Sequence, residues 1–355
     1  MPRLPAYRVL ADGTDITDRL ASRSASIEIG YPDNGEGGYL AIACDDGPEP
    51  PFELGRPPRS DGIALPRHGA VLAVSIAEPD GRLAPMGTFI VDEVEMTAPP
   101  RRLTVLARSA DLRGSLKERK RRHWDQTTLG AIVQRLAAEH GLKAGVAPVL
   151  ATVPVPYIAQ LDESDLGFLR RLGRRHDALT MVANGSLLLI PRGFGMAASG
   201  KIMPPIEVPA HRVRTVKVGF VDHGRVGGVR ARAYDARLAR SVERIVGEGG
   251  AAGPIHTLLD RTLDPTDAAR AARAEDSGLA RGRRILALDM TGDARIDIGS
   301  LITLTGFRDE VEGTSSVTTV RHRIDGRGYR LELKAELPTE RAREDKGRER
   351  GGRAR

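Results

Sequence analysis

Cysteine is nearly absent from this chain, and its scarcity excludes two kinds of site. The 355 residues include one cysteine, Cys44. A single thiol cannot form a disulfide within the chain, and it cannot supply a metal site built from several thiolates. The sequence therefore favours synthesis in a reducing compartment such as a cytoplasm, and it leaves the fold to be stabilised by its packed core.

Aromatic residues and long apolar runs are also scarce. Aromatic side chains make up 4% of the residues, so the cores must be packed from aliphatic and small side chains. No apolar run approaches the roughly 20 residues that cross a bilayer, and the first residues lack the apolar stretch of a secretory signal. We therefore expect no association with a membrane. The 40 glycines and 23 prolines suit many short strands and turns.

The positive charge of the chain is concentrated locally. The net charge is +7 and the isoelectric point is about 9.8, a balance that suggests nucleic-acid binding. However, residues 1–55 hold four arginines against ten acidic residues, whereas residues 101–122 hold nine basic residues against two acidic ones. The sequence shows no recognition helix and no aromatic platform for bases. We expect no specific nucleic-acid partner, and we interpret the basic stretch 117–122 as a solvated linker.

Hydrophobic periodicity predicts an α+β fold that is mainly β. Alternating or apolar runs predict strands at 7–10, 27–29, 39–44, 71–76, 89–94 and 103–106, and again at 213–221, 226–234, 301–305, 316–320 and 329–333. We predict four parts: a β-barrel-like domain over 1–110, an inserted α/β unit over 111–200, a second β-barrel-like domain over 201–337, and a disordered basic tail over 338–355. A peripheral helix is expected at 265–280, capped by Asp264.

The inserted unit is predicted to contain two helices and a β-hairpin. Thr127 or Thr128 is placed to cap a first helix that ends near Gly141, and Trp124 precedes this cap as a core residue. Asp162 is placed to cap a second helix, with acidic residues in its first turn. Asn184-Gly185 is the strongest hairpin signal in the chain.

Three short segments recur at a nearly constant separation. Strand-like segments that begin at Gly69, Gly87 and Leu103 resemble those at Gly299, Gly313 and Leu331, at separations of 230, 226 and 228 residues. Unrelated β-meanders also look alike, but agreement in order and spacing favours a true duplication. The sequence therefore predicts that the two β-barrel-like domains are related by internal duplication. Three such chains in a closed ring would present six similar domains.

The chain lacks the patterns expected of an enzyme. None of its eight histidines has a metal-ligand spacing, and there is no nucleophile elbow or phosphate-binding loop. Asp162, Glu163 and Asp165 form an acidic cluster, which we attribute to helix capping rather than to glycoside hydrolysis. His123, His140 and His176 flank helix ends, where we expect surface or dipole roles. We predict no catalytic residue, no cofactor and no metal.

Several segments together resemble the phage late control D family of tail hub proteins. The resemblance rests on HWDQTTLGAIVQRLAAEHGL at 123–142, YIAQLDESDLGFLRRLGRRHDA at 157–178, and NGSLLLIPRG at 184–193. IDIGSLITLTGF, VTTVRHRID and GYRLELKAEL near the end resemble the family's C-terminal barrel. The match covers roughly residues 4–337. The residues that carry the family motif are Trp124, Thr128, Leu129, Asp162, Glu163, Ser164, Asp165, Leu166, Phe168, Leu169, Asn184, Gly185 and Gly299.

The resemblance implies a structural role in a phage tail. A member of this family is expected to be a non-enzymatic homotrimer at the baseplate of a contractile tail or a tail-derived injection particle, synthesised in the cytoplasm of the bacterial host. Its pseudo-sixfold ring would join the hexameric tail tube to the trimeric tail spike, with the tape measure and baseplate wedge proteins as further partners. Two alternatives remain: a basic nucleic-acid-binding or late-gene regulatory protein, suggested by the isoelectric point and by the family's name, and a cell-wall hydrolase.

Overall fold

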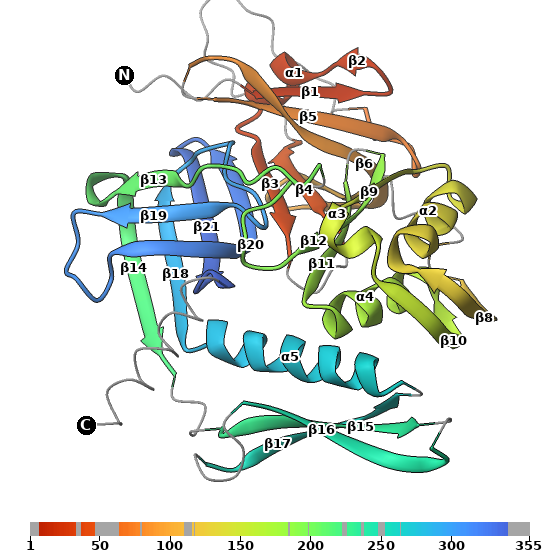
Figure 1. The fold of residues 1–355 in the computed structure, drawn as a ribbon. Coiled ribbons are helices and arrows are strands. Elements are labelled where there is room, and N and C mark those ends of the chain that lie inside the picture. Colours follow the sequence, from red (N-terminus) through yellow and green to blue (C-terminus); the bar gives the residue numbers. More distant parts are fainter. Residues whose placement is uncertain are drawn as a thin grey trace, which may run out of the picture.

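The computed structural model describes residues 7–32, 37–46, 64–78, 80–109, 116, 118–183, 185–197, 199–221, 226–235, 238–247, 253–262 and 264–339. Strands dominate this part of the chain, so the prediction of a mainly β, α+β fold is confirmed (Figure 1). No helix in the described ranges is long and apolar enough to cross a membrane. Most of the tail predicted for 338–355, and also Asn184, lie outside the described residues. Thr339, which the prediction assigned to the tail, is buried.

The first β unit is built from strands in which apolar residues alternate with polar or small ones. Its elements are β1 (Tyr7–Ala11), β2 (Thr14–Asp15), α1 (Thr17–Ala21), β3 (Ser26–Tyr31), β4 (Tyr39–Asp45), β5 (Val71–Ala77), β6 (Leu83–Thr97) and β7 (Arg102–Ser109). The strands lie in the order β3-β4-β7-β6-β5-β1. In β4, for example, Leu40, Ile42 and Cys44 point into the core while their neighbours are more exposed.

The second β unit repeats this arrangement. Its elements are β13 (Ile206–Pro209), η3 (Ala210–Arg212), β14 (Val213–Phe220), β18 (Arg284–Thr291), β19 (Leu301–Thr305), β20 (Gly313–Asp325) and β21 (Gly328–Glu336). The strands lie in the order β14-β18-β21-β20-β19-β13, which follows the order of the first unit, except that β13 pairs parallel with β19 whereas β1 pairs antiparallel with β5. Each unit surrounds a hydrophobic core of its own, as expected of barrel-like domains.

The two β units also agree in local detail. Gly69 and Gly299 precede β5 and β19 with φ angles of +87° and +81°, a region that favours glycine. The N–H of Gly69 donates to the carbonyl of Val91, and that of Gly299 donates to Val317. A β-bulge follows directly, after Val91 in β6 and after Val317 in β20. The internal duplication stays a prediction, which this agreement supports.

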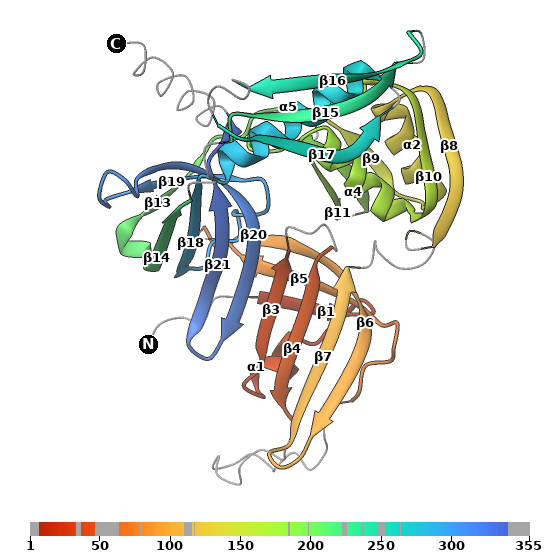
Figure 2. The same cartoon turned by 90° about the horizontal axis from the view of Figure 1, so that it is seen from below.

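The two β units join in one 13-stranded sheet. Strand β3 of the first unit pairs antiparallel with β20 of the second, so the sheet runs without a break from β14 to β1 (Figure 2). Ile324 of β20 packs in the core of the first unit, and Tyr31 of β3 contacts both cores. The β3–β20 contact therefore connects the two units by both hydrogen bonds and apolar packing.

The inserted unit contains the two predicted helices and the predicted hairpin. Its elements are β8 (Arg119–Thr128), α2 (Leu129–Glu139), β9 (Lys143–Val146), α3 (Pro148–Ala151), β10 (Pro154–Ser164), α4 (Asp165–Arg175), β11 (Ala178–Ala183) and β12 (Ser186–Pro191). Thr128 caps α2, as one of the two alternatives proposed, and Gly141 follows the helix with a φ angle of +68°. The linker interpretation of 117–122 is wrong for residues 119–122, because these residues belong to β8 and pair with β10.

A further layer covers the side of α5 that faces away from the rest of the molecule; the sequence patterns predicted its strand at 226–234 but not its other two strands or that it forms a separate sheet. Strands β15 (Gly228–Asp235), β16 (Arg240–Gly247) and β17 (Ile255–Thr262) form a separate sheet against α5 (Pro265–Arg281). Asp264 caps α5, as predicted, but the prediction that the helix is peripheral is wrong. Ala268 and Ala272 are fully buried against this sheet, in one core with Val229, Ala231 and Ala233.

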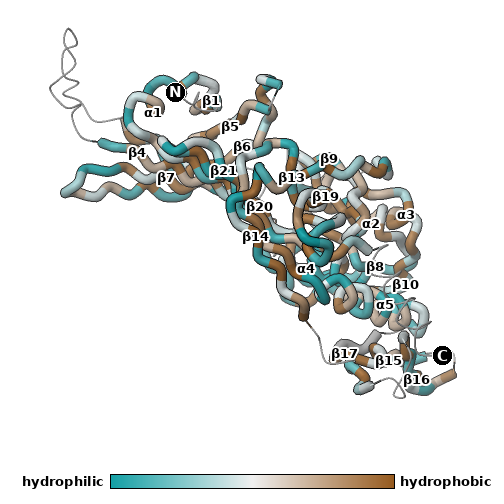
Figure 3. The backbone as a smooth tube through the Cα atoms, turned by 90° about the vertical axis from the view of Figure 1, so that its left-hand side faces the viewer, coloured by the Kyte–Doolittle hydropathy of each residue, from teal (hydrophilic) through white to brown (hydrophobic). Residues whose placement is uncertain are grey.

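Helix α5 also connects the inserted unit to the second β unit. Its last residue, Arg281, is buried and donates to Asp177 beside the hairpin and to Glu336 in β21. The long axis of the molecule runs from β4 and β7 at one end to β15–β17 at the other, with α5 near the latter end (Figure 3). The inserted unit lies between these two ends.

Candidate functional site

The aromatic residues of the sequence motif lie in the core of the inserted unit. Trp124 on β8 and Phe168 on α4 are buried and stack with ring centroids 6.0 Å apart. The guanidinium groups of Arg122 and Arg135 lie 4.8 Å and 5.1 Å from the centre of the Trp124 ring. The expectation that Trp124 is a core residue is confirmed.

The apolar and turn residues of the motif have structural positions as well. Leu129, Leu166 and Leu169 are buried in the same core as Trp124. Gly185 occupies the turn between β11 and β12 with a φ angle of +71°. Gly299 lies apart from them, at a place where a Cβ atom would contact Leu179 and Ile190 of the hairpin. These residues shape the unit and present no reactive group.

The predicted cap of helix α4 is wrong by two residues. The side chain of Ser164 accepts a hydrogen bond from the N–H of Gly167 at 3.1 Å, so Ser164 is the cap. Asp162 instead lies in β10 with a φ angle of +50°, next to a β-bulge, and accepts from Nε of Arg121 at 2.7 Å. The bulge moves Asp162 away from the helix. Glu163 instead lies over the helix and pairs with Arg171 of α4 at 2.8 Å.

Asp165 is the centre of a buried polar network. Its side chain is fully buried and accepts from Nζ of Lys120 at 2.6 Å, and also from Gln160, His140 and Arg122. Burial alone would raise the pKa of the Asp165 carboxyl, but the hydrogen bonds from Lys120, Gln160 and His140 and the charge of Arg122 outweigh it and lower this pKa. The carboxylate is therefore ionised and joins β8, β10, α2 and α4.

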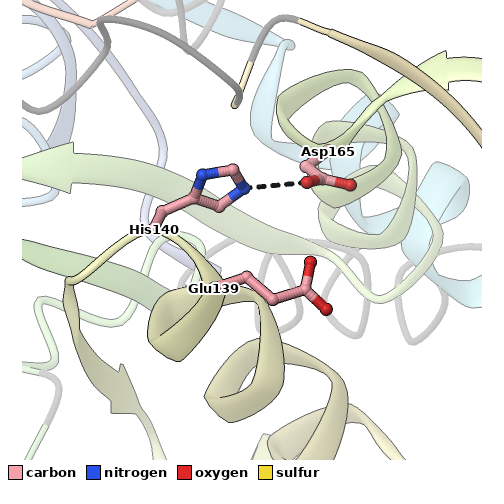
Figure 4. Close-up of side chains that lie close together, drawn as sticks. All are labelled: Glu139, His140 and Asp165. Atoms are coloured by element: carbon pink, nitrogen blue, oxygen red, sulfur yellow. Dashed lines mark hydrogen bonds and ion pairs between the residues drawn. The ribbon is translucent and has the colours of Figure 1, made fainter.

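Glu139, His140 and Asp165 are close enough together to suggest a metal site (Figure 4). One ligand atom from each lies within 4.8 Å of the others. Two cations already neutralise this cluster: Lys120 contacts both carboxylates, and so does Arg122. A metal ion would have to displace them, because like charges repel at these distances. We therefore interpret the cluster as a structural network and not as a metal centre.

The histidine predictions hold for one of three residues. His123 is exposed and stacks on Tyr157, as a surface residue would. His140 is buried at the Asp165 network. His176 is half-buried: burial, together with the charges of Arg270 and Arg175, lowers its pKa to about 4, so it is neutral near pH 7 and does not stabilise a helix dipole there.

Two open strand edges are the largest feature that the motif analysis missed. Within the described ranges, β14 pairs only with β18, and the end of β6 beyond Asp92 pairs only with β7. Their apolar side chains are exposed: Met96 on β6 is 58% exposed and Phe220 on β14 is 65% exposed. An open edge presents unpaired N–H and C=O groups with which a strand of another chain can pair. The signal that could have found them is the likeness of IEIGY at 27–31 to VKVGF at 216–220.

Comparison with known proteins gives one consistent family. Residues 59–327 match the family described as phage tail baseplate hub (GPD). A probable baseplate hub protein of Escherichia phage P2 is 31% identical over 375 residues, covering 94% of this chain and 93% of that protein.

Two solved structures share the fold. The 43 kDa tail protein of prophage MuSo2 from Shewanella oneidensis has a TM-score of 0.68 at 15% identity, covering 94% of this chain and 98% of that chain. A component of the type VI secretion system of Escherichia coli has a TM-score of 0.51 at 13% identity, covering 94% and 74%. The family match and the P2 relative together span most of the sequence. The chain therefore belongs to the phage tail baseplate hub (GPD) family.

Proposed function

We propose that this hub protein is a homotrimer whose pseudo-sixfold ring joins the hexameric tail tube to the trimeric tail spike of a contractile phage tail or a tail-derived injection particle. Membership of the hub family locates the protein in the baseplate of the virion tail. The proposed ring would lie between the hexameric tail tube and the trimeric tail spike. Three chains with two similar units each would present six similar units to the tube and three identical chains to the spike.

The repeated strand order is the observation that carries this proposal. Strands β3-β4-β7-β6-β5-β1 and β14-β18-β21-β20-β19-β13 follow the same path, so one chain offers two similar units. Three chains would offer six. The two units are joined within the chain by β3 and β20, whereas the outer edges at β6 and β14 are open. In a ring that closes through these edges, every β unit would pair with a neighbouring unit on both sides.

The same arrangement of strands suggests a role for each part of the chain. We propose that 1–110 and 201–337 are the two ring domains, the second carrying the separate layer of β15–β17 and α5, that 111–200 is an outer unit, and that 338–355 is a tail. The spike and tube are the expected direct partners, with the tape measure and wedge proteins next to them. The side-chain clusters of the inserted unit are accounted for by packing and ion pairing, which supports a role without catalysis.

The mass of the protein in solution tests the proposal. The chain should be measured alone and mixed with the spike protein encoded beside it, because an isolated hub can remain monomeric. The proposal expects three hub chains for each spike trimer, and rings in negative-stain images. A hub that stays monomeric in both samples, with no ring in the images, would refute it.

A further inference from the structure

The β3–β20 contact inside the chain is a template for a contact between chains. In this contact Val320 lies opposite Tyr31, and His322 lies opposite Ile29. Because the two β units share one strand order, each strand of the second unit has a counterpart in the first, and only the short β2 of the first unit has none among the described strands. The counterpart of β20 is β6, and the counterpart of β3 is β14. Those two strands carry the open edges.

The register between β3 and β14 follows from their neighbours. In the first unit Ile29 pairs with Leu40 and Gly30 pairs with Tyr39; in the second, Val218 pairs with Leu286 and Gly219 pairs with Ile285. The neighbouring strands match in burial, since Leu40, Ile42 and Cys44 correspond to Leu286, Leu288 and Met290, all of which are buried. The segment IEIGY at 27–31 therefore corresponds to VKVGF at 216–220.

The register between β6 and β20 follows from the shared bulge. Val91 pairs with Ala107 just before the bulge in β6, and Val317 pairs with Ala335 just before the bulge in β20. After the bulge, Val94 pairs with Val105 and Val320 pairs with Leu333. Val94 is thus the counterpart of Val320, and Met96 is the counterpart of His322.

From these two registers we propose that the open edge of β6 in one hub chain pairs antiparallel with β14 of a second copy, with Val94 opposite Phe220. The same register sets Met96 opposite Val218 and Thr97 opposite Lys217. This inference rests on the proposed trimer and specifies how its subunits meet. The sheet of each chain then continues into the next, and the ring closes without an open edge.

The exposure of the side chains at the two open edges supports pairing with a second copy of the chain. In the contact within the chain, Val320, His322 and Ile29 are each at most 1% exposed. Their counterparts at the open edges are uncovered: Met96 is 58% exposed, and Val94 and Val218 are partly exposed. Phe220, the counterpart of Tyr31, is 65% exposed. Pairing of the two edges would remove this apolar surface from water.

Charge complementarity supports the same register. Across the contact within the chain, Nε of Arg321 lies 3.5 Å from the carboxylate of Glu28. The counterpart of Arg321 is Glu95, and the counterpart of Glu28 is Lys217. The signs are exchanged, yet the pair remains attractive. Both side chains are exposed, and neither has an ion pair within the described part of the chain. A salt bridge between Glu95 and Lys217 of neighbouring copies fits both observations.

Disulfide cross-linking tests the register in the full chain bound to its spike. Residues directly opposite each other in an antiparallel pair have Cα atoms roughly 4.5–5.5 Å apart, within the range that a disulfide bridges. The double variant Thr97→Cys, Lys217→Cys should give covalently linked dimers and trimers on mild oxidation. The only native thiol, Cys44, is 2% exposed and stays out of reach. Both substituted side chains are exposed, so the fold should be retained.

Matched variants separate this register from other contacts. Thr97→Cys with Thr215→Cys keeps the same strands but shifts the partner by two residues, which places the Cα atoms more than about 7 Å apart, and it should not cross-link. Lys217→Cys alone should not cross-link either. A covalent dimer from this single variant would show β14 pairing with β14 around a twofold axis and would overturn the proposal.

Charge reversal provides a second test that does not depend on oxidation. Glu95→Lys or Lys217→Glu alone should weaken trimer assembly on the order of tenfold, and the two changes together should restore it. Failure of the double variant to restore assembly would contradict the pair. If trimers form on the spike but the Thr97–Lys217 cross-link does not, the register is wrong while the proposed function stands. If no trimer forms, both fail.

Discussion

At the scale of single residues, the most demanding position is Asp165. A fully buried carboxylate is costly unless its charges and hydrogen bonds are satisfied, and here four donors from β8, β10 and α2 meet it. Sequence reasoning placed Asp165 in the first turn of a helix, which is correct. It could not foresee the partners, because Lys120 and Arg122 are 45 and 43 residues away.

Replacing Asp165 should therefore destabilise the protein strongly. The change Asp165→Ala leaves the partly buried cations of Lys120 and Arg122 without their partner, at an expected cost of about 3–5 kcal/mol in the free energy of unfolding. Urea unfolding followed by Trp124 fluorescence measures it. Asp162→Ala is the matched control: it removes an exposed ion pair with Arg121 and should change stability little. Equal effects of the two changes would contradict the network.

His322 should make the stability of the protein depend on pH. Burial lowers its pKa from 6.5 to about 4, although the charge of Asp293 acts in the opposite direction. The unfolded chain therefore binds a proton at a higher pH than the folded chain does. This contribution is present above about pH 6.5 and is lost as the pH falls toward 4, by on the order of 3 kcal/mol at most.

Unfolding in urea at several pH values between 7 and 4 checks this expectation. The variant His322→Leu should lose stability less steeply over that interval than the unchanged protein. His123→Leu, at an exposed position, is the control and should retain the full slope. An unchanged slope in His322→Leu would show that this histidine does not stay neutral in the folded chain.

At the scale of elements, local patterns predicted helices and hairpins better than irregular strands. The caps of α2 and α5, the hairpin β11–β12 and most strands of the two β units were predictable from periodicity and turn residues. Strand β16 was not, because most of its residues are exposed and no alternation marks it. The basic start of β8 was interpreted as a linker because its charges are neutralised by acidic residues that are distant in the sequence.

The cap of α4 gives a direct test at this scale. Ser164→Ala should lower the free energy of unfolding by about 0.5–2 kcal/mol, because the N–H of Gly167 loses its acceptor. Thermal unfolding of this variant beside Asp162→Ala distinguishes the two candidate caps. A larger loss in Asp162→Ala would support the original sequence prediction and contradict the position of the helix start.

At the scale of the whole molecule, the 13-stranded sheet provides the open surfaces for assembly, and the sequence motif of the inserted unit does not. The sequence motif lies in the inserted unit, where its side chains pack or form ion pairs, whereas the repeated strands build the surfaces that remain open. Three of the repeated segments were recognisable from spacing alone. The repeat of IEIGY as VKVGF became visible only when strand pairing aligned β3 with β14, because its separation of 189 residues differs from that of the other three.

The proposed function depends above all on the symmetry of the hub bound to its spike. Electron cryomicroscopy of that complex should show a ring of three hub chains with six similar β units, in which β14 of each chain lies beside β6 of the next. A ring of two or six chains would contradict the proposed trimer, and three chains whose β6 and β14 edges both face solvent would contradict the proposed pairing.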